Sequence, residues 1–184
     1  RLIGASMRLF VDFMRALGVL TYEFHGAERL GRPRQLIVAN HPSLIDVVFL
    51  LAFARDAGCV VKHGLWRNPL TRAAVSAAGY CSNVSTEVMV STAVDVLDEG
   101  QSLIMFPEGT RTRPGVPIAL HRGAANVAVK AAQVVTPVYI RVAPTTLTKA
   151  EPWYQIPRRR PLFSLRVGED LDLEPGSRLE QQEQ

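Results

Sequence analysis

Short apolar runs alternate along this chain with segments of helical pattern, and this alternation limits the fold more than any other feature. Strand-like runs are expected at 20–24, 35–39, 59–62, 80–82, 102–106, 134–142 and 162–167. Helices are expected at 3–17, 43–54, 69–79, 87–98 and 122–132. Repeated strand–helix–strand units predict an α/β domain with a largely parallel central sheet flanked by helices. Ligands of such sheets bind beyond the carboxyl ends of the strands.

The first helix is amphipathic. Apolar side chains recur on one face at spacings of four and three, and an arginine recurs every seven residues on another face. The apolar positions are Ile3, Met7, Phe10, Met14 and Leu17, and the basic ones are Arg1, Arg8 and Arg15. Such a helix can lie in a membrane interface or pack on the domain as a surface helix, and the pattern leaves both open. No uninterrupted apolar stretch is long enough to span a bilayer.

The formal charge of +4 is mild and dispersed, which argues against a nucleic-acid-binding surface. Lysine occurs only at positions 62, 130 and 149, so nearly all the cations are arginines, which suit forked contacts with phosphate or carboxylate. Cys59 and Cys81 have no partner at metal-ligand spacing, so they predict neither a metal site nor a disulfide framework. They are typical of buried thiols in a reducing compartment.

A histidine and a carboxylate follow the end of one expected strand. His41 comes directly after the apolar run 36–39 and Asn40, and Asp46 lies five positions beyond it. A histidine that is oriented by a carboxylate can act as a general base. Ser43 and Asp46 also fit a helix capping box, in which the carboxylate would bind backbone amides and His41 would be an ordinary turn residue. The spacing alone leaves both interpretations open.

A second motif follows the strand expected at 102–106. Its residues are Pro107, Glu108, Gly109, Thr110 and Arg111. The guanidinium could hold an anion by a forked contact, and the glutamate could accept from a hydroxyl or orient the arginine. The same residues would also suit an exposed surface turn. If the two strand ends share one rim of a sheet, the two motifs together would form a site.

Taken together, the motifs resemble the lysophospholipid acyltransferase family, typified by 1-acylglycerol-3-phosphate acyltransferases. Residues 40–46 match its His-x4-Asp block, and residues 106–111 match its Phe-Pro-Glu-Gly-Thr-Arg block residue for residue. Residues 62–79 are similar to the family's middle block, 121–124 to its basic-Gly-Ala step, and 135–138 to its late Val-Pro-Val strand. The order and spacing of these blocks agree as well.

The resemblance implies a glycerolipid-acyltransferase-like fold and transfer of a fatty acyl group to a hydroxyl of a lysolipid. The donor would be a thioester, either acyl-coenzyme A or acyl carrier protein, and no further cofactor and no metal is expected. His41 would be the general base and Asp46 the group that orients it. Substrate binding is implied for Lys62, Glu108, Gly109, Thr110 and Arg111.

One stretch departs from the family pattern. Members that act on glycerol phosphate acceptors usually carry an arginine shortly after the glycine matched by Gly79, whereas 79–84 holds no cation. The alternative is therefore a same-family enzyme with another acceptor, such as an aminolipid or a lipid-anchored pigment. A non-catalytic lipid-binding module and a soluble thioesterase are more distant alternatives. Residues 158–160, three arginines between prolines, could contact a headgroup or form a basic loop attracted to an anionic membrane.

We expect one domain over residues 1–184, because this length supports one full core and is marginal for two. Residues 1–20 would be an amphipathic helix suited to a membrane surface, 21–170 the catalytic core and 171–184 a polar tail. The expected partners are a membrane surface, the lysolipid acceptor and the acyl donor, with no nucleic acid. The expected location is the cytoplasmic face of a membrane, namely a bacterial inner membrane.

Overall fold

A computed structural model describes residues 2–54, 56–61, 81–82, 85–113, 115–152 and 154–172. Its helices are α1 (Leu2–Ala16), α2 (Asp46–Phe53), α5 (Thr86–Asp98) and α6 (Gly123–Ala131), with a short 3-10 helix, η1 (Ala27–Arg29). Its strands are β1 (Thr21–His25), β2 (Gln35–Ala39), β3 (Ala57–Val61), β4 (Cys81–Ser82), β5 (Ser102–Met105), β6 (Val134–Ala143) and β7 (Leu162–Val167). The helix expected at 69–79 lies outside the described residues.

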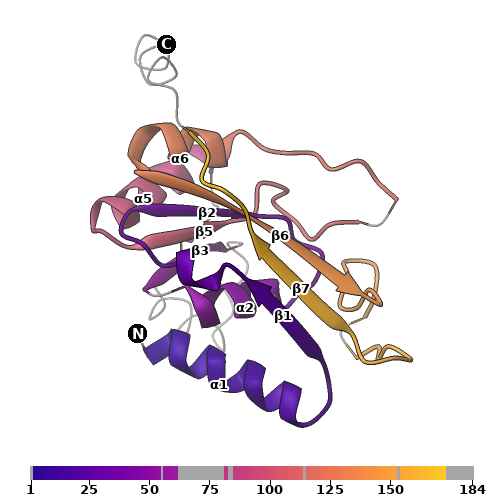
Figure 1. Ribbon diagram of the computed structural model, residues 1–184. Helices are drawn as coiled ribbons and strands as arrows, with labels where there is room; N and C mark the ends of the chain where they lie inside the picture. The colour runs from indigo at the N-terminus through magenta and orange to yellow at the C-terminus, as the bar shows by residue number, and fades with distance from the viewer. Residues whose placement is uncertain are drawn as a thin grey trace.

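In the described part of the chain, seven strands form one sheet in the order β1-β7-β6-β2-β5-β3-β4 (Figure 1). Neighbouring strands are parallel except for β6 and β7, which are antiparallel. The described residues of the connection from β6 to β7, 144–152 and 154–161, contain no helix that could carry the chain back across the sheet, and a parallel pair needs such a crossover. The predicted α/β class with a largely parallel sheet and an N-terminal helix is confirmed.

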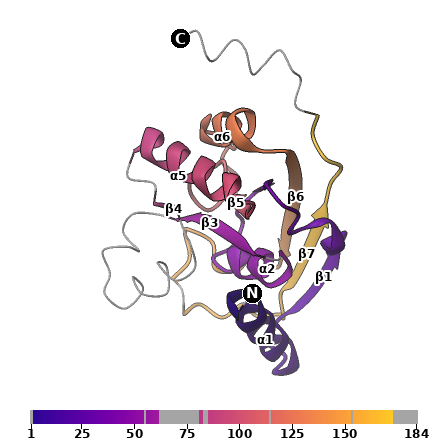
Figure 2. The same cartoon turned by 90° about the vertical axis from the view of Figure 1, so that its left-hand side faces the viewer.

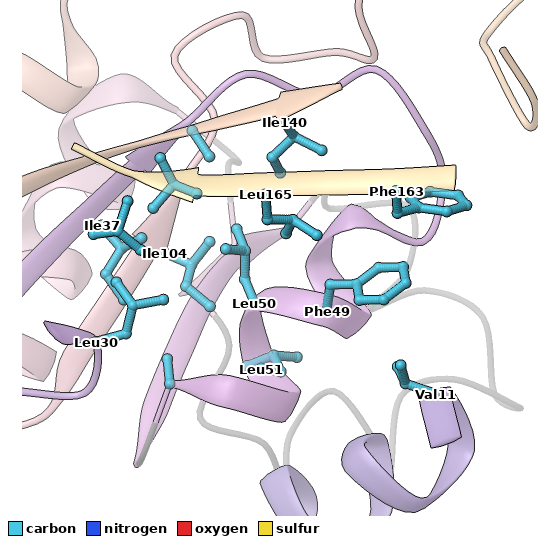
Figure 3. Packing of buried hydrophobic residues seen from close by; sticks show 14 of the residues in the cluster. Val11, Leu30, Ile37, Phe49, Leu50, Leu51, Ile104, Ile140, Phe163 and Leu165 are labelled. Carbon is cyan, nitrogen blue, oxygen red and sulfur yellow. The ribbon is translucent and has the colours of Figure 1, made fainter. Parts of the chain in front are cut away.

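Helices cover both faces of this sheet. α5 and α6 lie on one face, and α2 lies on the other with α1 outside it (Figure 2). The alternation of side chains along the strands separates two cores, because successive residues of a strand point to opposite faces. Leu36 and Leu103 pack with α5 and α6, whereas their neighbours Ile37 and Ile104 pack toward α2. Figure 3 shows the second core, in which Phe49 of α2 lies among side chains of the strands.

α1 carries two apolar stripes rather than one. Val11 is fully buried, and Met7 and Met14 pack beside it against the core. Phe10 and Leu17, which the spacing places on the same face, are 46% and 63% exposed. The buried face is centred on Val11, and Phe10 lies about 100° from it around the helix, at the edge of that face. A second stripe points away from the core and consists of Leu2, Leu9, Phe13 and Leu17.

A polar network closes the edge of the sheet where β2 and β6 begin. The buried Gln35 amide donates to the Arg29 carbonyl at 2.9 Å and to Thr136 Oγ1 at 2.7 Å, and it accepts from two backbone amides. Arg32 holds Asp170 by two hydrogen bonds of 2.9 and 2.6 Å. Together with a hydrogen bond from Thr136 Oγ1, this contact lowers the pKa of Asp170 to about 2.

Replacing Asp170 by asparagine is expected to weaken the fold in a pH-dependent way. A carboxyl whose pKa falls on folding, here from 3.8 to about 2, stabilises the folded state above its unfolded pKa. The wild type should therefore be more stable at neutral pH, and the difference should shrink as the pH falls from about 4 toward 2. Urea unfolding at several pH values measures this difference. Glu169→Gln, at an exposed neighbouring position, is the matched control, and a pH-independent difference would contradict the network.

Candidate active site

Three adjacent parallel strands bring the two motifs to one edge of the sheet. β2 lies between β5 and β6, and the loops that follow β5 and β6 both extend beyond the carboxyl end of the sheet (Figure 1). Asn40 follows the last residue of β2, and its side chain continues the hydrogen bonding between β2 and β6. Its Nδ2 donates to the Ile140 carbonyl at 2.8 Å, and its Oδ1 accepts from the Ile140 amide at 2.7 Å. His41 therefore leaves the sheet from a fixed point.

His41 and Asp46 form a pair in the turn between β2 and α2. His41 Nδ1 lies 3.0 Å from Asp46 Oδ2, and the same oxygen accepts from the Ser43 amide at 2.6 Å. The carboxylate thus binds both a backbone amide, as in a capping box, and the imidazole. The Ser43 hydroxyl, by contrast, makes no capping bond, and α2 begins at Asp46 itself. The contact between His41 and Asp46 that the functional interpretation requires is present, and so is one of the two hydrogen bonds of the capping box.

The Asp46 carboxyl is fully buried, while the His41 side chain is 18% exposed. Burial raises the pKa of Asp46, and the hydrogen bonds from His41 and the Ser43 amide oppose this rise. Within the described residues, Asp46 Oδ1 has no hydrogen-bond partner. Since one oxygen makes both hydrogen bonds, the orientation of the carboxylate relative to the imidazole is determined by the turn.

Glu108 holds the main chain of His41 from the other side. Its Oε1 accepts from the His41 amide at 2.9 Å and from Thr112 Oγ1 at 2.8 Å, and the side chain is only 7% exposed. The Thr112 amide returns a hydrogen bond to the His41 carbonyl at 2.7 Å. The His41 ring also stacks on Phe106, with centroids 4.1 Å apart. Glu108 therefore supports the main chain of His41. Because its side chain is buried, the interpretation of residues 107–111 as an exposed surface turn is wrong for Glu108.

The other residues of this motif lie nearer the surface. Gly109 has a φ of 60°, in the left-handed region that glycine adopts readily, and a Cβ there would lie 3.2 Å from the His121 ring. Arg111 reaches across the edge to the loop after β6, where its Nη1 donates to the Leu147 and Thr148 carbonyls at 2.9 Å each. Both hydrogens of Nη1 are thereby used.

Residues 21–141 match the family model described as Acyltransferase. The chain belongs to the acyltransferase family. This match spans both motifs, the strands β2 and β5 that precede them, and most of β6.

Curated relatives of this acyltransferase resemble it over part of their length. It is 29% identical over 145 residues to the 1-acyl-sn-glycerol-3-phosphate acyltransferase of Borreliella burgdorferi, which covers 75% of this chain and 58% of that protein. It is 29% identical over 106 residues to the chloroplastic LPAT1 enzyme of the same name in Arabidopsis thaliana, covering 55% of this chain and 30% of that protein. The chain therefore spans less than two thirds of these relatives.

A solved structure shares the fold of the acyltransferase. The crystal structure of the 1-acyl-sn-glycerophosphate acyltransferase PlsC from Thermotoga maritima superposes with a TM-score of 0.70 at 22% identity. The match covers 97% of this chain and 74% of the other one. At this level of identity the likeness establishes the architecture, which agrees with the glycerolipid-acyltransferase-like fold expected above.

Six of the seven predicted site residues lie at this edge of the sheet, and the seventh, Lys62, is outside the described residues. His41, Asp46 and Glu108 are in contact, with Gly109 and Arg111 beside them. Thr110 lies between the last two in the chain. Lys62 and the cation-free stretch 79–84 fall in a part of the chain of which only residues 81–82 are described, so their roles remain predictions.

Two contacts of the acyltransferase site were not predicted. Thr112 supports Glu108, and Leu147 accepts from Arg111. Thr112 directly follows the motif, and a threonine at that place is a usable signal because its hydroxyl can reach a carboxylate four residues back. Leu147 offers only a backbone carbonyl, so its side chain gives no such signal. In the described ranges there is neither a cluster of three metal-binding side chains nor a helix long and apolar enough to cross a bilayer.

Proposed function

We propose that this chain transfers a fatty acyl group from a thioester to a hydroxyl of a lysolipid. The observation that carries the proposal is the His41–Asp46 pair, held at the carboxyl edge of the sheet by Glu108 in a member of the acyltransferase family. Such a pair supplies a base to a hydroxyl, and a thioester is already activated toward attack by that hydroxyl. No cofactor besides the donor thioester, carried by coenzyme A or acyl carrier protein, is part of the proposal.

In the proposed mechanism each ring nitrogen of His41 has a separate task. Nδ1 faces Asp46 and would carry the proton, so Nε2 presents its lone pair to the acceptor. The acceptor oxygen gives its proton to Nε2 as it attacks the thioester carbonyl. The tetrahedral intermediate then collapses to the new ester and expels the thiolate, which takes the proton back from Nε2. Asp46 stabilises the imidazolium between these two steps.

The acceptor would lie against residues 108–111. Gly109 and Thr110 form the surface of this turn, and Arg111 retains Nε and Nη2 for a headgroup because Nη1 is committed to carbonyls. Lys62 remains a proposed contributor. The names of the relatives favour 1-acylglycerol-3-phosphate as the acceptor. A non-phosphorylated acceptor is the second candidate, because residues 79–84 lack the cation that phosphate-binding members usually carry.

Mass spectrometry of reaction products tests the proposal. Purified protein is incubated with acyl-coenzyme A or acyl carrier protein and with paired lysolipids that differ only in a phosphate headgroup. We expect a diacyl product that depends on both substrates. Release of free fatty acid at the same rate without any lysolipid would indicate a thioesterase, and an unconsumed thioester would leave only a lipid-binding module.

We further propose that the chain works at a membrane surface, namely the cytoplasmic face of a bacterial inner membrane. The outer stripe of α1 exposes Leu9 and Phe13, at 72% and 57%. The Arg160 guanidinium lies against Gly18, just beyond the end of α1, so the exposed arginines 158–160 adjoin this helix. The exposed Ile156 belongs to the same loop. Apolar side chains beside several arginines suit an anionic lipid surface.

The double variant Leu9→Ser with Phe13→Ser is expected to bind vesicles of anionic phospholipid more weakly. Both side chains are exposed, so the free energy of unfolding should change little, while binding should fall roughly tenfold or more because apolar burial in the bilayer is lost. Vesicle sedimentation measures this effect. Val88→Ser, at a 51% exposed position of α5 on the other face of the sheet, is the control. Equal binding by all three proteins would exclude α1 from the membrane contact.

A further inference from the structure

One backbone oxygen connects the two motifs of the site. The Leu147 carbonyl, in the loop after β6, accepts from Arg111 Nη1 at 2.9 Å and from the Leu44 amide at 3.1 Å. Leu44 lies in the turn between His41 and Asp46 and immediately follows Ser43, whose amide binds the Asp46 carboxylate. A change in the position of this oxygen would therefore shift the segment that orients the imidazole.

Leu147 adopts a conformation that leucine rarely takes. Its φ is 55°, in the left-handed region, where contact between Cβ and the backbone is unfavourable for all residues except glycine. Such residues persist where the surroundings determine them, and they cluster at functional sites. Here Thr146 and Thr148 on either side are buried, and the Thr148 amide donates to Glu151 Oε2 at 2.9 Å. The left-handed residue therefore belongs to a held segment and directs its carbonyl toward the two donors.

We propose that Leu147 and Arg111 form a positioning clamp for the His41–Asp46 turn. The term clamp here means the Leu147 carbonyl together with its two donors, Arg111 Nη1 and the Leu44 amide. In this role the Leu147 carbonyl and Arg111 Nη1 do not touch the substrate, and Nε and Nη2 of Arg111 remain for the headgroup contact proposed above. The clamp acts on the rate through the orientation of His41. The inference rests on the proposed acyl transfer and adds to it a residue that lies outside both sequence motifs.

The clamp and a headgroup contact predict different kinetics for Arg111→Gln. Loss of a clamp lowers kcat by the same factor for acceptors with and without phosphate, because the defect lies at the base. Loss of a headgroup contact raises KM for phosphorylated acceptors and leaves the others unchanged. A change confined to the KM of phosphorylated acceptors would therefore overturn the clamp.

A series at position 147 tests the left-handed conformation itself. Leu147→Gly and Leu147→Asn accept this conformation, whereas the β-branched Leu147→Val opposes it. We expect kcat to stay near the wild-type value for the first two and to fall several-fold for the third, because a β-branched side chain opposes this conformation more strongly than leucine does. Leu171→Val, at an exposed position on the opposite edge, is the matched control. A ranking in which valine is best and glycine worst would show that only side-chain packing matters, which overturns the proposal.

Amide hydrogen exchange of the protein without substrate gives a readout independent of activity. In Leu147→Val and in Arg111→Gln, the Leu44 amide should exchange several-fold faster, because its acceptor is displaced. The Ile140 amide, which donates to Asn40, should keep its protection and serves as an internal reference. Unchanged exchange at Leu44 would refute the clamp. If the wild type fails to transfer acyl groups, the proposed function falls, while this measurement still decides the clamp.

Discussion

Replacing His41 by alanine is expected to lower acyl transfer by roughly 10² to 10⁴, the contribution of a general base. The reason is the geometry of the pair, in which Nδ1 is bound to Asp46 and Nε2 is left for the acceptor hydroxyl. The hydrogen bonds of His41 to Glu108 and Thr112 use its backbone, so they survive the substitution and the fold should be kept. Product formation under saturating substrate measures the loss.

His25→Ala is the matched control for this variant. His25 lies in β1 with its side chain 65% exposed, away from the motif residues, and its loss should leave the rate unchanged. Circular dichroism and thermal unfolding of both variants establish that the fold is intact. A His41→Ala protein that is folded and transfers acyl groups within a few-fold of the wild-type rate would remove His41 from the chemistry.

Replacing Asp46 by asparagine is expected to lower kcat by up to about 10⁴, since an amide neither fixes the imidazole tautomer nor stabilises the imidazolium. The same substitution should raise the free energy of unfolding or leave it unchanged. Burial holds the pKa of Asp46 above its usual value. The contribution of this carboxyl to the stability of the folded state is therefore complete at low pH, where it is protonated, and is lost as the pH rises through the folded pKa. At neutral pH the ionised carboxyl therefore weakens the fold, and asparagine removes that cost.

Thermal unfolding at pH 7, measured beside the kinetics, separates the two roles of Asp46. A Tm at or above the wild-type value together with a large fall in kcat is the expected outcome. Asp95→Asn, at an exposed position of α5, controls for the loss of a charge. If Asp46→Asn unfolds well below the wild type and its rate falls only in proportion to the folded fraction, the carboxylate serves only as a cap for α2.

Local patterns predicted the elements well where apolar runs end in turn residues. The expected strands at 35–39 and 162–167 coincide with β2 and β7. The direction of β7 was not predictable, because strand direction depends on the partner strand rather than on the strand's own residues. The burial pattern of α1 was only partly predicted, since an apolar stripe does not show which of two apolar faces meets the core.

In the site as well, contacts between residues close in sequence could be predicted, whereas contacts between distant residues could not. The His41–Asp46 pair joins residues five apart, so the sequence spacing could suggest it. Support of His41 by Glu108 depends on the pairing of β2 with β5, which only the tertiary structure establishes. Leu147 is the extreme case. Leucine disfavours a left-handed backbone, so the residue type argues against the conformation that the surroundings impose.

The central position of β2 has a consequence for synthesis on the ribosome. The Asn40 side chain binds Ile140 of β6, 100 residues away in the sequence, and the His41 amide binds Glu108, which follows β5 and is 67 residues away. In the sheet, β5 and β6 are nevertheless the direct neighbours of β2. Contacts between residues so distant in sequence form late in folding. A nascent chain therefore exposes its histidine and aspartate long before it can hold them, and it acquires a complete site only after β6 and the Leu147 loop have emerged.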